Sequence, residues 1–305
     1  MMLIYLVKVL NIFACGVKFV VDLIRNIVMR TRSSTNQELN VRNSPSTSKK
    51  SRNILMSNIS DLVERFNSIA LQEGSYPELT AEQEEEIEKA LHGGPNTDTI
   101  ITRFHLIITR ADLSTLAGDN RLNDQIINFY LNLLVERNAT DPHLPRLYAM
   151  NTFFVPKLLS SGHAALRRWT RKVDLFAHDL ILVPVHIAGL DHWCMAIVDL
   201  GQHTIRYYDS LGGGRPNHQV MDALERYLRE ESLDKRGKPL ERPDYEKRHM
   251  RECPRQEYSN DCGVFSCAFA EHEARKVAVK GFGQAQMAYF RRKMVYEISK
   301  GRLLT

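Results

Sequence analysis

The sequence predicts an α+β domain over residues 75–305, preceded by an apolar segment and a polar linker. Three observations lead to this prediction. A run with helical periodicity begins at Cys262, two strand-like runs lie at 193–200 and 204–208, and the composition changes sharply near residue 75. The 231 residues from 75 onward are enough to bury a complete core.

Residues 1–30 are mostly apolar and predict an amphipathic helix with a narrow polar face. At about 100° per residue one face collects the polar positions Lys8, Asn11, Lys18, Asp22, Arg25 and Asn26. The longest uncharged stretch, Val9 to Val17, has nine residues, well short of the ~20 that cross a bilayer. We therefore expect association with a membrane surface, with a marginal transmembrane anchor and a partner-docking helix as alternatives.

Residues 31–74 predict a linker that is mostly disordered, because Ser, Asn, Thr and basic residues replace the apolar ones. A short amphipathic helix is expected at 61–71. Residues 1–74 hold ten Lys and Arg against five Asp and Glu, which leaves 31 of each for residues 75–305 from the totals of 41 and 36. A domain without net charge gives no reason to expect nucleic-acid binding.

The first helix of the domain is expected from Thr80, a capping residue, through the Glu-rich run to Leu91. The runs 193–200 and 204–208 read as neighbouring strands joined by a turn at 201–203. His192 stands just before the first strand and Asp209 just after the second, so both fall at one end of the sheet. The carboxylate can then orient the imidazole. The alternative is ordinary: a packing histidine and a turn aspartate.

The run from Cys262 to Lys276 predicts a helix whose cap is Asn260-Asp261 and whose apolar side faces a core. A thiol in the first helical turn lies in the positive end of the helix dipole, which favours the thiolate. Gln256 lies six positions upstream. Because cysteine is among the most buried residue types, an inert core thiol is the alternative.

The order His192, Asp209, Gln256, Cys262 resembles that of the ubiquitin-like-protein proteases, and among them the SUMO (sentrin)-specific proteases. The likeness extends to 121–130, 151–154, 168–170 and the tail 289–298, so it covers about residue 75 to the C-terminus. The resemblance implies a papain-like cysteine protease fold, with a helical part packed on a mixed sheet.

The same resemblance implies the catalytic roles. Cys262 attacks the carbonyl carbon after the C-terminal Gly-Gly of SUMO, and His192, paired with Asp209, protonates the departing lysine amine. Gln256 offers a side-chain N–H to the developing oxyanion, and the loss of one such donor costs roughly 100-fold to 1000-fold in rate. The expected activity is deconjugation of SUMO, and precursor maturation with it. A protease for another ubiquitin-like modifier and a weakly active SUMO-binding module are the alternatives.

The substrate-binding residues also come from the resemblance. Trp193 would roof the tunnel for the glycine pair, and Arg121 stands where the family has a second tryptophan, which implies a looser tunnel and a lower turnover. The surface for the body of the modifier would comprise Asp124, Phe153, Phe154, Arg168 and Trp169. For both phenylalanines, in an expected strand at 151–154, a core position is the alternative.

The five cysteines, Cys15, Cys194, Cys253, Cys262 and Cys267, suggest no disulfide framework and suit a reducing compartment. A zinc site from His249, Cys253 and Cys262 lacks a fourth ligand and a paired Cys-x2-Cys, so no metal or cofactor is expected. We expect an intracellular monomer in the nucleus or cytoplasm, associated with a membrane if residues 1–30 bind one.

Overall fold

The computed structural model describes residues 76–212, 217–258 and 260–304. The chain divides into two units, Met1–Arg65 and Phe66–Thr305, and all described residues lie in the second. The predictions for residues 1–30, the linker 31–74 and the short helix 61–71 therefore fall outside the described residues. Within the described ranges, no helix has the length and hydropathy that crossing a bilayer requires.

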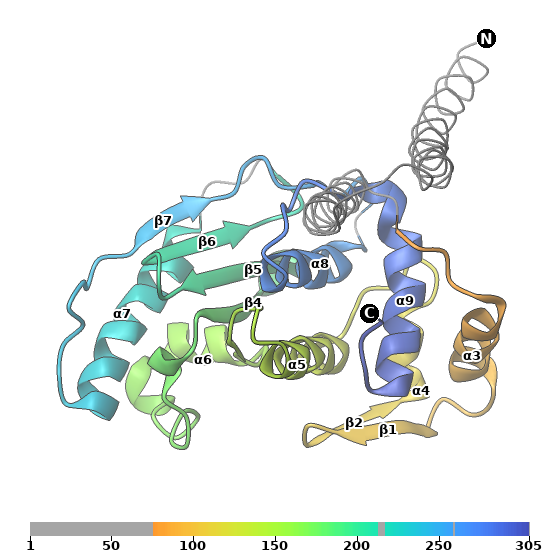
Figure 1. Cartoon of the computed structure of the whole chain (residues 1–305), viewed down its shortest axis with the longest axis horizontal. Coiled ribbons are helices and arrows are strands. Elements are labelled where there is room, and N and C mark those ends of the chain that lie inside the picture. Colours follow the sequence, from red (N-terminus) through yellow and green to blue (C-terminus); the bar gives the residue numbers. More distant parts are fainter. Residues whose placement is uncertain (1–75, 213–216, 259, 305) are drawn as a thin grey trace, which may run out of the picture. The chain divides into compact units, whose positions relative to one another are not determined.

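A five-stranded mixed sheet forms the middle of the second unit (Figure 1), in the order β3-β4-β5-β6-β7. Its strands are β3 (Leu147–Ala149), β4 (Leu180–Ile187), β5 (His192–Asp199), β6 (Thr204–Tyr208) and β7 (Glu246–His249). The three central strands are antiparallel, whereas β3 and β7 pair in parallel with their neighbours. The predicted pair of strands is thus the hairpin β5–β6.

Helices cover both faces of the sheet, because side chains along each central strand alternate between two cores. Along β5, Trp193, Met195 and Ile197 join the core with α5 (Asp124–Thr140) and α8 (Cys262–Ala274). The intervening Cys194, Ala196 and Val198 join the other core, with α6 (Phe154–Ser161) and α7 (His218–Arg236). These helices and the mixed sheet confirm the predicted α+β class.

Helix α8 is the central helix, and all but one of its residues are buried. It begins at Cys262, as predicted, and ends at Ala274, two residues before the predicted end. One side of α8 packs on β5 and another on α5 and on α9 (Met287–Lys300). A helix surrounded in this way is buried on every side rather than along one face.

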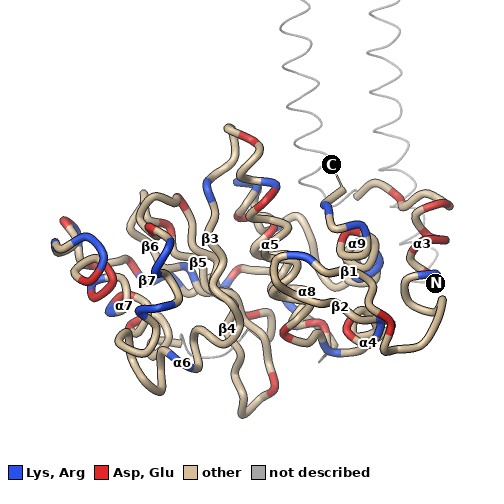
Figure 2. The backbone as a smooth tube through the Cα atoms, turned by 90° about the horizontal axis from the view of Figure 1, so that it is seen from below, with Lys and Arg blue, Asp and Glu red and all other residues tan. Residues whose placement is uncertain are grey.

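The remaining elements form the side of the domain away from the large sheet. They are α3 (Ala81–His92), the hairpin of β1 (Thr99–Arg103) and β2 (Leu106–Thr109), and α4 (Arg110–Leu113). Thr80 caps α3 and forms a capping box with Gln83, which confirms the predicted start of the helix. Arg292 of α9 is paired with Glu84 and Glu88 of α3. Along the described chain, acidic and basic residues are interspersed (Figure 2).

The expected strand at 151–154 is wrong. Asn151 accepts the N–H of Phe153 at 2.8 Å through its side chain and the N–H of Phe154 at 3.0 Å through its carbonyl oxygen. These bonds turn the chain, and α6 begins at Phe154.

Candidate active site

The hairpin β5–β6 brings His192 and Asp209 together. His192 is the first residue of β5, and Asp209 follows the last residue of β6. The Nε2 atom of His192 donates to Oδ1 of Asp209 at 2.8 Å, with both side chains almost buried. The same Oδ1 accepts the backbone N–H of Leu211 at 3.0 Å. Because Nε2 is engaged by the carboxylate, Nδ1 is the nitrogen left for proton transfer.

Cys262 begins α8, which packs directly on β5, and its side chain is buried. Burial raises the pKa of the Cys262 thiol, but hydrogen bonding to His192 and to the backbone N–H groups of Trp193 and Gly263 outweighs burial, so the pKa lies below its ordinary value. The converse holds for His192. Burial lowers its pKa, whereas hydrogen bonds to Asp209, Cys194 and Cys262 raise it by more. These opposite shifts favour a thiolate–imidazolium pair.

Asp261 precedes α8 as expected, but its side chain does not cap the helix. Its backbone is helical rather than extended, and a capping side chain requires extended backbone. The carboxylate is bound instead by Arg291 of α9, whose Nε and Nη2 lie 2.9 and 2.7 Å from Oδ1, and by Gln284 at 2.6 Å. The predicted cap at Asn260-Asp261 is therefore wrong in this detail. Arg291 of α9 and Gln284 therefore hold the start of α8 through the Asp261 carboxylate.

Gln256 is held beside Asp209 through the next residue, Ser210. Its backbone N–H donates to the Ser210 carbonyl oxygen at 2.9 Å, and its Oε1 accepts from the Ser210 hydroxyl at 2.6 Å. Its Nε2 donates to the carbonyl oxygen of Tyr258 at 2.9 Å. A primary amide carries a second hydrogen on that nitrogen. The oxyanion role of Gln256 remains a prediction.

Trp193 and Arg121 lie against the segments that carry the thiol and the imidazole. The indole N–H of Trp193 donates to the carbonyl oxygen of Leu122 at 3.1 Å, in a buried position. Arg121 donates to Asp191, at 2.6 Å to its carbonyl oxygen and 2.7 Å to its carboxylate, and to Asn260 at 2.9 Å. These hydrogen bonds fix the position of the guanidinium. The looser tunnel expected from an arginine at this position remains a prediction.

Comparison with known proteins agrees with this geometry. The model of the Ulp1 protease family, C-terminal catalytic domain, matches residues 120–303, which include His192, Asp209, Gln256 and Cys262. The chain belongs to the Ulp1 protease family. Over 218 residues it is 45% identical to a sentrin-specific protease of Caenorhabditis elegans, and over 229 residues 42% identical to sentrin-specific protease 2 of Homo sapiens.

Those alignments cover 72% and 74% of this chain but only 31% and 38% of the relatives, so the chain matches about a third of their length. Among solved structures, the C-terminal Ulp1 protease domain in complex with Smt3, the yeast ortholog of SUMO, matches with a TM-score of 0.65 at 28% identity. The match covers 74% of this chain and 97% of that one. The predicted protease fold is therefore confirmed as that of the Ulp1 family.

The other residues that the Ulp1-family resemblance assigned to the modifier divide by exposure. Arg168, Trp169 and Phe153 are exposed, Phe153 by 57%, and Asp124, the first residue of α5, is half-buried. Phe154 is fully buried, with its ring 4.9 Å from that of Tyr227. Its assignment to the binding surface is wrong, because the turn at 151–153 directs it into the core.

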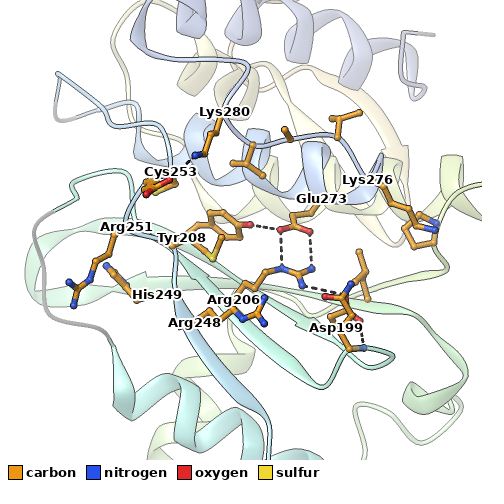
Figure 3. A pocket seen from close by; sticks show the side chains of 18 of the residues that line it. Asp199, Arg206, Tyr208, Arg248, His249, Arg251, Cys253, Glu273, Lys276 and Lys280 are labelled. Atoms are coloured by element: carbon orange, nitrogen blue, oxygen red, sulfur yellow. Dashed lines mark hydrogen bonds and ion pairs between the residues drawn. The ribbon is translucent and has the colours of Figure 1, made fainter. Parts of the chain in front are cut away.

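Behind the catalytic residues, β6 is tied to α8 by side chains that the sequence did not single out. Arg206 of β6 donates to both carboxylate oxygens of Glu273, at 3.0 and 2.8 Å, and Tyr208 donates to the same group (Figure 3). They line a pocket of about 1110 Å³. Cys253 also lines it, and the Cys253 thiol lies 3.5 Å from the carbonyl oxygen of Asp209. The strand before Asp209 is thereby held to the helix of Cys262.

Two groups within the described part of the chain bring three metal-ligand atoms within 4.8 Å of one another. The first is His192, Cys194 and Asp209, and the second is His163, Glu231 and Asp234. In the first group the imidazole and the carboxylate already bond each other. In the second, His163 bonds Glu231 at 2.7 Å and Arg167 pairs with Asp234. The protein's own contacts therefore account for both groups.

Proposed function

We propose that this chain is a cysteine protease that hydrolyses the peptide or isopeptide bond after the C-terminal Gly-Gly of SUMO. The observation that carries the proposal is the pairing of His192 with Asp209 at 2.8 Å, next to a Cys262 whose pKa lies below its ordinary value. SUMO as the modifier is supported by the names of the related proteases and by the Smt3 complex of the Ulp1 domain.

In the first half of the reaction the Cys262 thiolate forms a C–S bond with the carbonyl carbon of the last glycine. The carbonyl electrons move to oxygen, where the backbone N–H of Cys262 and the Gln256 amide stabilise the charge. The oxyanion then collapses, the C–N bond breaks, and the Nδ1 proton of His192 passes to the lysine amine. A thioester remains.

In the second half, neutral His192 accepts a proton from water as the water oxygen attacks the thioester carbon. The C–S bond breaks, and Cys262 returns to a thiolate beside the imidazolium. The carboxylic acid formed at the last glycine loses its proton to solvent, and SUMO leaves with a free glycine carboxylate. Throughout, Asp209 keeps the imidazole oriented and stabilises its positive charge without itself taking up a proton.

The modifier is tested by incubating the protein with SUMO, ubiquitin and other ubiquitin-like proteins, each bearing a C-terminal electrophile. We expect an adduct with SUMO that a Cys262→Ser variant does not form. Adducts only with another modifier would show a cysteine protease that acts on that modifier and not on SUMO. Tight SUMO binding without any adduct would overturn the protease in favour of a binding module.

We also propose that the protein acts inside the cell as a monomer, in the nucleus or cytoplasm, and that residues 1–30 bind a membrane surface. The membrane part is supported by the narrow polar face of the apolar stretch Met1 to Met29 and by the basic Arg30 and Arg32 that follow this stretch. A fusion of residues 1–32 to a fluorescent reporter tests the membrane part, since a diffuse signal would overturn it.

A further inference from the structure

Arg121 joins the two segments that lead into the catalytic residues. Through Nη1 it donates to the carbonyl oxygen and to the carboxylate of Asp191, the residue before His192. Through Nε it donates at 2.9 Å to the side chain of Asn260, two residues before Cys262. One guanidinium, placed just before α5, therefore spans the approach to β5 and the approach to α8.

The Asp191 end of this bridge is a turn with left-handed backbone. Asp191 has φ of 47° and ψ of 51°, in the region that, among residues with a side chain, Asn and Asp tolerate best. Its carboxylate also accepts from Nε2 of His186 at 3.1 Å. Hydrogen bonds from His186 and then from Arg121 lower the pKa of Asp191, so the carboxylate is ionised at neutral pH. The turn is thus held from both sides by donors to one carboxylate.

The next residue, Leu122, contacts the same two segments. Its carbonyl oxygen accepts the indole N–H of Trp193, and its side chain packs against Gly263 so closely that a Cβ there would lie 2.8 Å from the Leu122 Cβ. The backbone at 121–122 is therefore seated in contact with the residues that follow both His192 and Cys262. A shift of the backbone at 121–122 would therefore disturb the residues that follow both His192 and Cys262.

We propose that Arg121 is a positioning residue, which bridges Asp191 and Asn260 and so keeps His192 and Cys262 in reacting geometry before substrate binds. The proposal rests on the proposed function of Cys262 as nucleophile. Arg121 touches neither reacting atom and acts only through the two neighbouring segments. Its side chain is 37% exposed and that of Asp191 68% exposed, so the ion pair is weak and is screened by salt. We therefore expect a modest effect on rate.

The experiment measures the pH dependence of Cys262 alkylation by iodoacetamide in the full chain, without any modifier present. We expect Arg121→Ala and Asp191→Asn each to slow alkylation at pH 6.5 by about threefold to fivefold, the range of an exposed ion pair. Asparagine tolerates the left-handed turn, so the second variant removes charge without new strain. The double variant should lose less than the product of the two single losses, because both substitutions remove the same ion pair between Arg121 and Asp191.

Two further measurements distinguish the loss of the bridge from a folding defect. Arg121→Lys keeps the charge but cannot reach both partners as a planar fork, so an intermediate rate is expected. Addition of 0.5 M NaCl, where the screening length falls to only a few ångströms, should slow the wild type toward the Arg121→Ala rate and leave that variant unchanged.

Arg229 offers a matched control. It is 43% exposed and, like Arg121, binds a backbone carbonyl oxygen, that of Pro243 at 3.0 Å, and a carboxylate, that of Asp244 at 2.7 Å. Arg229→Ala should leave the alkylation profile unchanged.

The bridge would be overturned if Cys262 is reactive but the pH dependence of its alkylation is the same in Arg121→Ala as in the wild type. It would also be overturned if the two single losses in alkylation rate add fully in the double variant. Either result would leave the proposed function intact. A wild-type Cys262 no more reactive than the buried Cys267 would overturn the proposed function itself, and the bridge with it.

Discussion

At the scale of single residues, the chemistry of the site depends on the hydrogen bond between His192 and Asp209. It directs Nε2 to the carboxylate, and the charge on Asp209 favours the protonated imidazole beside the thiol of Cys262. Their positions beside a strand or helix end mark these three residues as candidates, but each also has an ordinary reading when taken alone. Their catalytic roles are predicted by the order in which they occur, which resembles that of the ubiquitin-like-protein proteases, and the hairpin geometry brings two of them together.

The first prediction concerns the protonation of Cys262. In Asp209→Asn the pKa of His192 falls, so the imidazolium is lost at lower pH and the pKa of the Cys262 thiol rises. Less thiolate is then present at pH 6.5, and a rise of one pKa unit lowers its fraction about tenfold. The alkylation rate of Cys262 at pH 6.5 should fall by about that factor. If the acid side of the pH–rate profile for Cys262 alkylation is the same in Asp209→Asn as in the wild type, the assignment of Asp209 as the partner of His192 is contradicted.

The second prediction separates two neighbouring phenylalanines. Phe154 is fully buried, so Phe154→Ala should lower the free energy of unfolding by about 3–5 kcal/mol. Phe153 is 57% exposed, so Phe153→Ala should change stability by less than about 0.5 kcal/mol. If Phe153 contacts the modifier, its truncation should weaken SUMO binding by about fivefold or more. Denaturant unfolding measures the change in stability, and calorimetric titration measures the change in SUMO affinity. Equal stability losses in the two variants would contradict the assignment of Phe154 to the core and Phe153 to the surface.

At the scale of elements, the start of α8 depends on a close approach by the segment before α5. Gly263 permits it, because any Cβ at that position would meet the Leu122 side chain. Gly263 follows Cys262 directly in the sequence, but the reason for a glycine at this position appears only in the fold. The neighbour that demands it is 141 positions away by residue number.

The third prediction follows from that approach. Gly263→Ala should displace the 121–122 segment and lower kcat/KM for a SUMO amide by about tenfold to 100-fold, since small misplacements at a reacting centre are costly. Gly189 is the control. It lies near His192 in the sequence, and a Cβ there meets nothing within 4 Å. Gly189→Ala should stay within about twofold of the wild type, and equal losses in both variants would contradict the steric explanation.

At the scale of the whole molecule, the fold holds its catalytic elements through ion pairs between distant parts of the chain. Arg206 with Glu273 joins β6 to α8, and Arg291 with Asp261 joins α9 to the start of α8. The sequence predicts the fold class and the reactive residues, but not these pairs. A charged residue carries no local sign of its partner, and Arg291 and Arg292 look alike until the helix is packed.

The fourth prediction uses that neighbouring pair. Arg291 and Asp261 are almost completely buried, so Arg291→Met leaves a buried carboxylate without its positive partner and should cost about 3–5 kcal/mol of the free energy of unfolding. Arg292 pairs with Glu84 and Glu88 in partly exposed positions, so Arg292→Met should cost less than about 1 kcal/mol. Denaturant unfolding of the two variants measures the difference, and the reverse order would contradict the assigned burial.

Hydrolysis of a SUMO–lysine isopeptide by the full chain, followed by intact mass, tests most directly whether Cys262 and His192 form a protease site for SUMO. The wild type should release SUMO that ends in a free Gly-Gly carboxylate together with unmodified lysine. Cys262→Ser and His192→Ala should release neither at a measurable rate. Release by the wild type that persists in Cys262→Ser, or no release by the wild type under conditions in which the protein is folded, would contradict the account.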